Sequence, residues 1–205
     1  MRSMQVVPMV ALLAATAMAA PAHAAVSRDP SREDLQQLLL DTQDLPEATG
    51  KTWRAGALVT TGPTGPAGTT ESSGCAALDN AVLAQNTGLT DSGVQAFYAE
   101  SGDFLEQTVV YDPAASEHLR ELSGAIMQCP AMKFSDGPAV TLKPFDLGPA
   151  VAGFRSFVGD QSQSAVLLAQ HGDHIVEFVM SDGGYTDAQL QSLLRAAFAQ
   201  IDHPN

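Results

Sequence analysis

Apolar residues recur along this chain with two spacings, and each spacing predicts a different kind of element. Spacings of three and four residues predict amphipathic helices over 31–40, 75–85, 113–128 and 186–201. Short alternating or continuous apolar runs between turn residues predict strands over 52–59, 94–99, 104–111, 139–142, 151–158, 164–170 and 175–180. Helices and strands are therefore mixed along the length of the chain.

The connections between the predicted strands indicate the fold class. Residues 101–103 and 172–173 are short turns with hairpin signatures, so the strands beside them should pair antiparallel. The Asp112-Pro113 step is typical of a helix start, and Thr186 with Gln189 matches a capping box. We therefore predict an α+β fold, a twisted and mainly antiparallel sheet with amphipathic helices packed on it.

The first 24 residues differ from the rest of the chain. Arg2 supplies a positive start, residues 6–20 are almost wholly apolar, and Ala22-His23-Ala24 is a small-x-small sequence. This combination predicts a signal peptide over 1–24, cleaved after Ala24, whose apolar run is too short to span a membrane. No cysteine lies at the cleavage site, and a lipoprotein would need one there to carry the lipid. We expect a secreted, extracellular protein that is not lipid-anchored, with residues 25–205 forming one domain.

The charge balance limits the partners of that domain. The chain has 10 Lys and Arg against 23 Asp and Glu, which gives a formal net charge of -13. The field of such an acidic protein repels phosphate, and no Lys or Arg cluster offers a local exception, so we expect no nucleic-acid partner. No second apolar run approaches ~18 residues, and we predict no membrane span in the mature domain.

Cys75 and Cys129 are the two cysteines of the sequence. Each lies on the apolar face of a predicted helix, one at a helix start and the other at a helix end, so a bridge would tie two helices together. Such a disulfide persists outside the cytoplasm, and closing a loop of this size stabilises by about 4 kcal/mol. A redox pair favours Cys-x-x-Cys spacing, and zinc needs further ligands, so we interpret the pair as structural.

The turn at 171–174 is the candidate for metal chemistry. In a tight hairpin His171 and His174 would be directly opposed, and with Asp173 they could bind a metal ion or respond to pH. A further ligand is missing from the local sequence, and we favour a solvated hairpin tip. We therefore predict no metal site and no cofactor.

Acidic residues are the candidates for catalysis. No Gly-x-Ser-x-Gly nucleophile elbow occurs. A fold can assemble distant acids as a glycosidase pair, and Asp79, Glu100, Asp103 and Asp112 are candidates for it. Since the sequence selects no pair among its 23 acids, solvated surface carboxylates are the simpler interpretation.

Aromatic residues in predicted strands could line a ligand cleft, although such residues are more often part of a core. The candidates are Trp53, Tyr98, Tyr111 and Tyr185. Arg155 lies in an apolar strand and needs an anionic partner, which would be an internal Asp or Glu or else a ligand. We name Trp53, Tyr98, Tyr111 and Arg155 as candidate cleft residues.

A set of short landmarks runs along nearly the whole domain. They are residues 38–40 with 44–46, Cys75 opening a helix, 110–113 before a helix that ends at Cys129, 147–149, the hairpin strands and 186–201. Their order resembles the PknH-type extracellular sensor domains of actinobacterial secreted proteins and lipoproteins. The resemblance implies a sheet flanked by helices, a helix-to-helix bridge between Cys75 and Cys129, and a cleft for a small ligand. The second disulfide and the kinase domain of the kinase-linked members are missing here.

The function that we expect is a non-enzymatic, sensor-like domain that binds a small or apolar molecule, or a cell-envelope ligand, in a cleft. One alternative is a secreted hydrolase whose carboxylates are assembled by the fold. Another is a protein-interaction module of the cell envelope, which would expose a large apolar patch.

Overall fold

The structure is a computed structural model that describes residues 32–45, 49–61, 74–81, 92–133, 138–181 and 185–204. The predicted signal peptide, its cleavage site after Ala24 and the Gly- and Pro-rich segment 62–73 lie outside these residues. The described elements begin with the helix α1 (Arg32–Gln37) and end with the helix α5 (Asp187–Asp202), with strands and the helix α4 (Ala115–Gln128) between them. The predicted mixture of helices and strands is confirmed.

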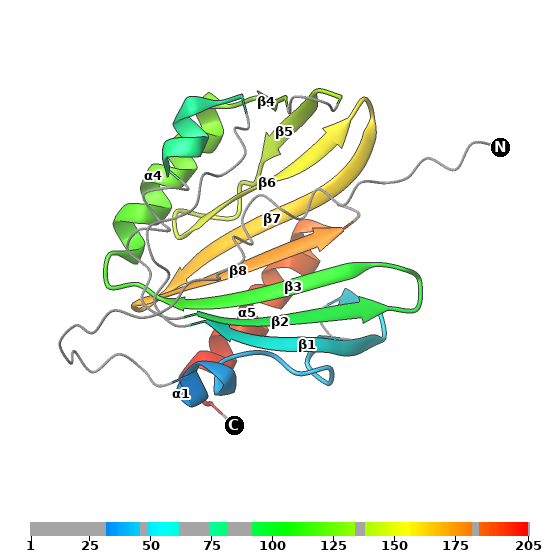
Figure 1. The fold of residues 1–205 in the computed structure, drawn as a ribbon, viewed down its shortest axis with the longest axis vertical. Coiled ribbons are helices and arrows are strands. Elements are labelled where there is room, and N and C mark those ends of the chain that lie inside the picture. The colour runs from blue at the N-terminus through cyan, green and yellow to red at the C-terminus, as the bar shows by residue number, and fades with distance from the viewer. Residues whose placement is uncertain are drawn as a thin grey trace.

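In the described part of the chain, eight strands form one sheet in which every pairing is antiparallel. They are β1 (Trp53–Thr61), β2 (Ser92–Ala99), β3 (Phe104–Tyr111), β4 (Ala131–Met132), β5 (Val140–Pro144), β6 (Val151–Val158), β7 (Gln161–His171) and β8 (His174–Ser181). Their spatial order is β1-β2-β3-β8-β7-β6-β5-β4 (Figure 1). The predicted α+β class with an antiparallel sheet is confirmed.

One face of the sheet is covered by α1 and α5, and Figure 1 shows α5 crossing behind the strands. Alternate residues of the strands point to this face, as the period of a half-buried strand requires. Leu190, Leu193 and Ala197 of α5 are fully buried against Phe97, Leu105 and Phe178 of the sheet. We call this side the α5 face.

The opposite face carries a second apolar cluster beneath α4. Leu119, Leu122 and Ile126 of this helix are buried against strand residues that include Phe154 and Leu168. Figure 1 shows α4 over the β6–β7 side of the sheet, away from β1 and β2. We call this side the α4 face.

The two predicted helix starts have different outcomes. The capping box of α5 is present, since Thr186 Oγ1 accepts from the Gln189 backbone N–H and the Gln189 side chain accepts from the Thr186 backbone. The predicted start of α4 at Pro113 is wrong, because the N-cap is Ala114 and has no side-chain cap. Asp112 instead accepts a hydrogen bond from the Ala114 backbone N–H through Oδ1, at 2.8 Å.

Candidate functional site

Trp53 and Tyr98, both named as cleft candidates, lie on opposite faces of the sheet. Trp53 is 4% exposed and belongs to the core of the α5 face, which confirms the core interpretation for this residue. Tyr98 is 45% exposed and pairs across β1 with Arg54, on the other face. Its ring packs against Phe104 with centroids 5.4 Å apart.

Tyr111 and Arg155, the other two cleft candidates, both contact side chains of the protein itself. The Tyr111 ring meets His174 edge to face, with centroids 5.7 Å apart, at the far end of β3 from Phe104. Arg155 Nη2 donates to Asp187 Oδ1 at 2.8 Å and to the Tyr185 carbonyl at 2.7 Å, which confirms the expected internal acidic partner. The four candidates do not converge on one place, and their role in ligand binding stays a prediction.

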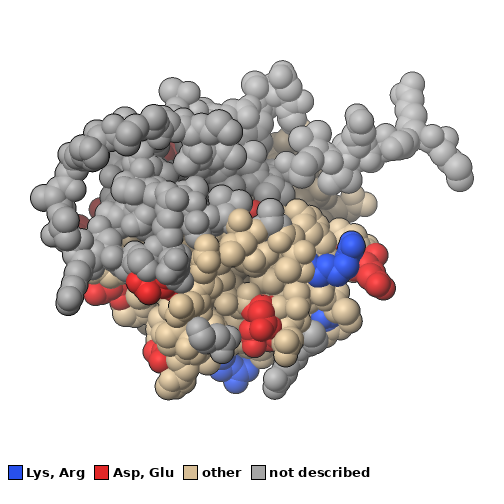
Figure 2. Space-filling model, turned by 60° about the horizontal axis from the view of Figure 1, so that its bottom comes forward, with Lys and Arg blue, Asp and Glu red and all other residues tan. Residues whose placement is uncertain are grey.

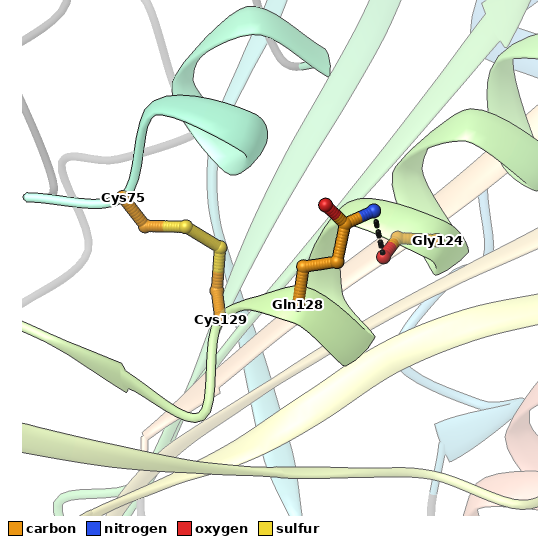
Figure 3. The surroundings of a disulfide bond; sticks show 4 residues. All are labelled: Cys75, Gly124, Gln128 and Cys129. Carbon is orange, nitrogen blue, oxygen red and sulfur yellow. Dashed lines mark hydrogen bonds between the residues drawn. A yellow bond between two sulfur atoms is a disulfide. The ribbon is translucent and has the colours of Figure 1, made fainter.

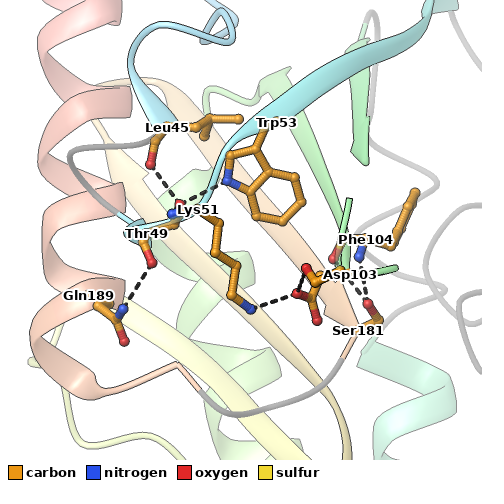
Figure 4. Close-up of polar contacts among 9 residues, drawn as sticks. Leu45, Thr49, Lys51, Trp53, Asp103, Phe104, Ser181 and Gln189 are labelled. Carbon is orange, nitrogen blue, oxygen red and sulfur yellow. Dashed lines mark hydrogen bonds and ion pairs between the residues drawn. The ribbon is translucent and has the colours of Figure 1, made fainter. Parts of the chain in front are cut away.

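Polar contacts around Trp53 join four parts of the chain (Figure 4). Trp53 Nε1 donates to Thr49 Oγ1 at 2.8 Å, and Gln189 Nε2 of α5 donates to the Thr49 carbonyl at 3.0 Å. Lys51 Nζ forms an ion pair with Asp103 Oδ2 at 2.9 Å, where the hydrogen bond from Ser101 and then Lys51 lower the pKa of Asp103. These contacts fix Trp53 as part of the packing between β1 and α5.

The histidines of the β7–β8 turn are directly opposed, as predicted. His171 Nε2 lies 2.8 Å from Asp202 Oδ1, and its ring stacks on Phe198 of α5 with centroids 4.6 Å apart. Burial lowers the pKa of His174. Among the residues that the structure describes, no three His, Cys, Asp or Glu side chains are grouped to hold a metal ion. His171 and Asp202 therefore tie the turn to the end of α5.

Cys75 and Cys129 form the expected disulfide, with Cα atoms 6.0 Å apart (Figure 3). Its helix-to-helix character is not confirmed. Cys75 precedes the helical residues 76–81, and Cys129 is the C-cap of α4. The bridge thus joins the residue before one helix to the residue after another, and it anchors the end of α4 beside the buried side chain of Leu78.

Two of the four acids named as glycosidase candidates, Asp103 and Asp112, lie at opposite ends of β3. Asp103 precedes this strand and Asp112 follows it, so about 30 Å separates them at ~3.3 Å per residue. Asp112 Oδ2 instead lies 2.7 Å from His118 Nδ1. Such a distance exceeds the ~5–10 Å that glycosidase pairs require, so these two acids cannot act together.

A different pair of acids is assembled on the α4 face, and the sequence analysis missed it. Glu106 of β3 faces Val179 and Glu177 of β8 faces Thr108, so the two glutamates occupy diagonal positions about 7 Å apart. Glu177 is 8% exposed, and its Oε1 has no hydrogen-bond partner among the described residues. The signal that could have found it is a lone acid in an otherwise apolar strand.

The pKa values of both glutamates lie above the ordinary value for this side chain. Burial first, and the neighbouring Glu106 carboxyl second, together raise the pKa of Glu177 to about 8. Burial also raises the pKa of Glu106. Within the described part of the chain neither carboxyl forms an ion pair with a Lys, Arg or His. The pair is therefore a site where a positive charge would be stabilised.

The charged side chains on one described surface are scattered. In the face that Figure 2 shows, blue and red side chains stand singly or in small mixed groups among uncharged residues. The described residues there do not gather Lys and Arg into a continuous patch.

An eight-stranded antiparallel sheet with helices on both faces and one disulfide defines an α+β class of domain. A solved structure with this fold is the extracellular domain of PknH from Mycobacterium tuberculosis, at a TM-score of 0.61 and 13% sequence identity. The match covers 84% of this chain and 96% of that domain. No family model matches the sequence, and no curated protein matches it significantly. The likeness is therefore one of fold.

None of the helices in the described ranges is both long and apolar enough to cross a bilayer.

Proposed function

We propose that this chain is an extracellular, non-enzymatic, sensor-like domain that binds a small or apolar molecule or a cell-envelope ligand. The observation that carries the proposal is the fold shared with the extracellular domain of PknH over 96% of that domain. The disulfide is of the kind that persists outside the cytoplasm. The predicted signal peptide over 1–24 with cleavage after Ala24 supports the same location.

The experiment that tests this function is native mass spectrometry of residues 25–205 after incubation with fractionated envelope lipids and metabolites. We expect an adduct that survives native ionisation and is released when the protein is denatured. Protein incubated with buffer alone is the control. If no fraction gives an adduct, the binding function is wrong.

Glycoside hydrolysis is a second candidate, because Glu106 and Glu177 lie on neighbouring strands on one face of the sheet, and glycosidases act through a pair of carboxyl groups. Glu177 is 8% exposed, which leaves little room for the sugar rings on both sides of a glycosidic oxygen that a general acid has to reach. A panel of p-nitrophenyl glycosides tests this candidate. Turnover that disappears in Glu106→Gln would support it, and a panel without turnover would reject it.

The interaction-module alternative has less support among the described residues. Their large exposed apolar side chains are Leu58 on β1, Tyr98 on β2 and Met127 on α4. Met127 lies on a different element from the other two, over another part of the sheet. These exposed side chains do not form one shared patch, which a docking surface of this kind needs.

A further inference from the structure

We propose that the α4 face of β2, β3 and β8 binds an organic cation, an ammonium group with an elongated apolar body. The site is formed by Tyr98, Phe104, Glu106 and Glu177, which we call the acidic–aromatic stripe. This inference rests on the proposed binding function and names the chemistry of its ligand.

The register places the four side chains in successive rows on one face. Tyr98 faces Phe104, Ala96 faces Glu106, and Glu106 in turn faces Val179. The next row along β8 holds Glu177. Rows on one face are two residues apart, or about 7 Å, so the aromatic pair lies about 14 Å from Glu177. The stripe matches a ligand of roughly that length.

Exposure falls along the stripe from one end to the other. Tyr98 is 45% exposed, Phe104 and Glu106 are half-buried, and Glu177 is 8% exposed. A ligand entering over Tyr98 would therefore reach Glu106 before Glu177. The apolar neighbours of Glu177 on this face, Val179 and Ile175, would surround the inner end of the ligand.

The inner end of the stripe lacks a positive charge. Glu177 Oε1 is buried without a hydrogen-bond partner in the described chain, although burying such an atom unpaired costs free energy. The other groups beside Glu177 are Thr108 on β3 and Leu168 on β7, which carry no charge. An ammonium group between the two carboxyls would supply the missing partner, as charge-assisted hydrogen bonds do.

The aromatic pair and the overall charge favour the same kind of ligand. Aromatic faces attract alkylammonium groups and pack against hydrocarbon, so Tyr98 and Phe104 would suit the body or the head of such a molecule. The net charge of -13 raises the local concentration of cations around the protein. An anionic or neutral ligand of equal chain length keeps the hydrocarbon packing but gains neither the cation–π attraction nor the attraction to the net negative charge.

The test uses n-octylamine as the probe, with n-octanol and octanoate as controls of equal chain length. Isothermal titration at pH 7 should show binding of octylamine at least tenfold tighter than either control. Glu106→Gln should weaken octylamine binding tenfold or more and leave octanol binding unchanged. Glu121→Gln on the exposed side of α4 is the matched control and should change nothing.

The possible failures separate the two proposals. If octanol or octanoate binds as well as octylamine, the cation assignment is wrong while an apolar binding function stands. If Glu106→Gln binds octylamine as the unaltered protein does, the site lies elsewhere. If the mass-spectrometric assay shows an adduct that octylamine does not displace, the binding function holds and the acidic–aromatic stripe is not its site.

Discussion

Replacing Glu177 by Gln should raise the stability of the protein at neutral pH. The pKa of Glu177 rises from an ordinary value of 4.5 to about 8 in the fold, because burial and then Glu106 disfavour its charged form. Between these two values the folded chain holds a proton that the unfolded chain releases, so the free energy of unfolding falls as pH rises. The stabilising proton is fully held below about pH 4.5 and is lost as pH passes 8.

The size of this effect follows from the same shift. At pH 7 the unfolded chain releases this proton, because pH 7 lies about 2.5 units above the ordinary pKa of 4.5. The release lowers the free energy of unfolding by about 3 kcal/mol. Gln carries no titrating proton, so Glu177→Gln should be more stable than the unaltered chain by about this amount at pH 7. The two should be nearly equal at pH 4.5. For a chain of this length the gain corresponds to about 6–12 °C in Tm.

Urea denaturation at half-unit steps from pH 4.5 to 8 measures the difference. Trp53 is the single tryptophan and is buried, so its fluorescence reports unfolding. Glu121→Gln, exposed on α4, is the control for loss of one negative charge. A difference between Glu177→Gln and the unaltered chain that stays constant across this pH range would refute the reasoning.

Substitutions at the disulfide, at Gly153 and at the cap of α5 test three further features of the fold. Replacing Cys75 and Cys129 together by Ser should lower the free energy of unfolding by about 4 kcal/mol, measured by urea denaturation without reductant. Gly153→Ala should lower the free energy of unfolding by at least about 2 kcal/mol. Gly153 has a φ of 151° in β6, and an added Cβ would collide with the Val166 carbonyl. An unchanged melting temperature would contradict this prediction. Thr186→Ala removes the cap of α5 and should cost about 1 kcal/mol by thermal denaturation, whereas Thr186→Ser should restore most of it.

Local features of the fold could be predicted because neighbouring residues determine them. The turn at Gly172 forces β7 and β8 into an antiparallel hairpin, and Gly172 takes the left-handed φ of 59° that such a turn favours. Thr186 and Gln189 are three residues apart and complete their capping box without help from the rest of the chain. In contrast, the helix start predicted at Asp112 depends on which groups its carboxyl binds, and the structure gives it two partners. It binds the Ala114 backbone and His118, and α4 begins later than expected.

The pairing of β3 with β8 could not be predicted because it joins segments far apart in the sequence. Val109 faces Val176, yet nothing in either strand specifies the other, since many apolar strands would fit. The candidate site depends on this pairing. Glu177 is a lone acid in an apolar strand, but its pairing with Glu106 arises only when β3 and β8 lie side by side with both acids on one face. For the same reason Tyr98 and Trp53 could not be assigned to opposite faces beforehand.

The two faces of the sheet differ in what they bury, and this difference explains how the fold tolerates a buried acid. The α5 face is sealed by α1 and α5, and the core there extends from Trp53 on the edge strand to Ala165 on β7. The apolar burial on this face contributes stability that can offset the cost of an acid buried on the other face. Burying Glu177 lowers the free energy of unfolding by about 3 kcal/mol at pH 7. Side chains that destabilise the fold in this way concentrate at functional sites. If a cation bound at Glu177, the carboxyl would ionise beside it and the cost would be offset, so the ligand should stabilise the fold more at pH 8 than at pH 5.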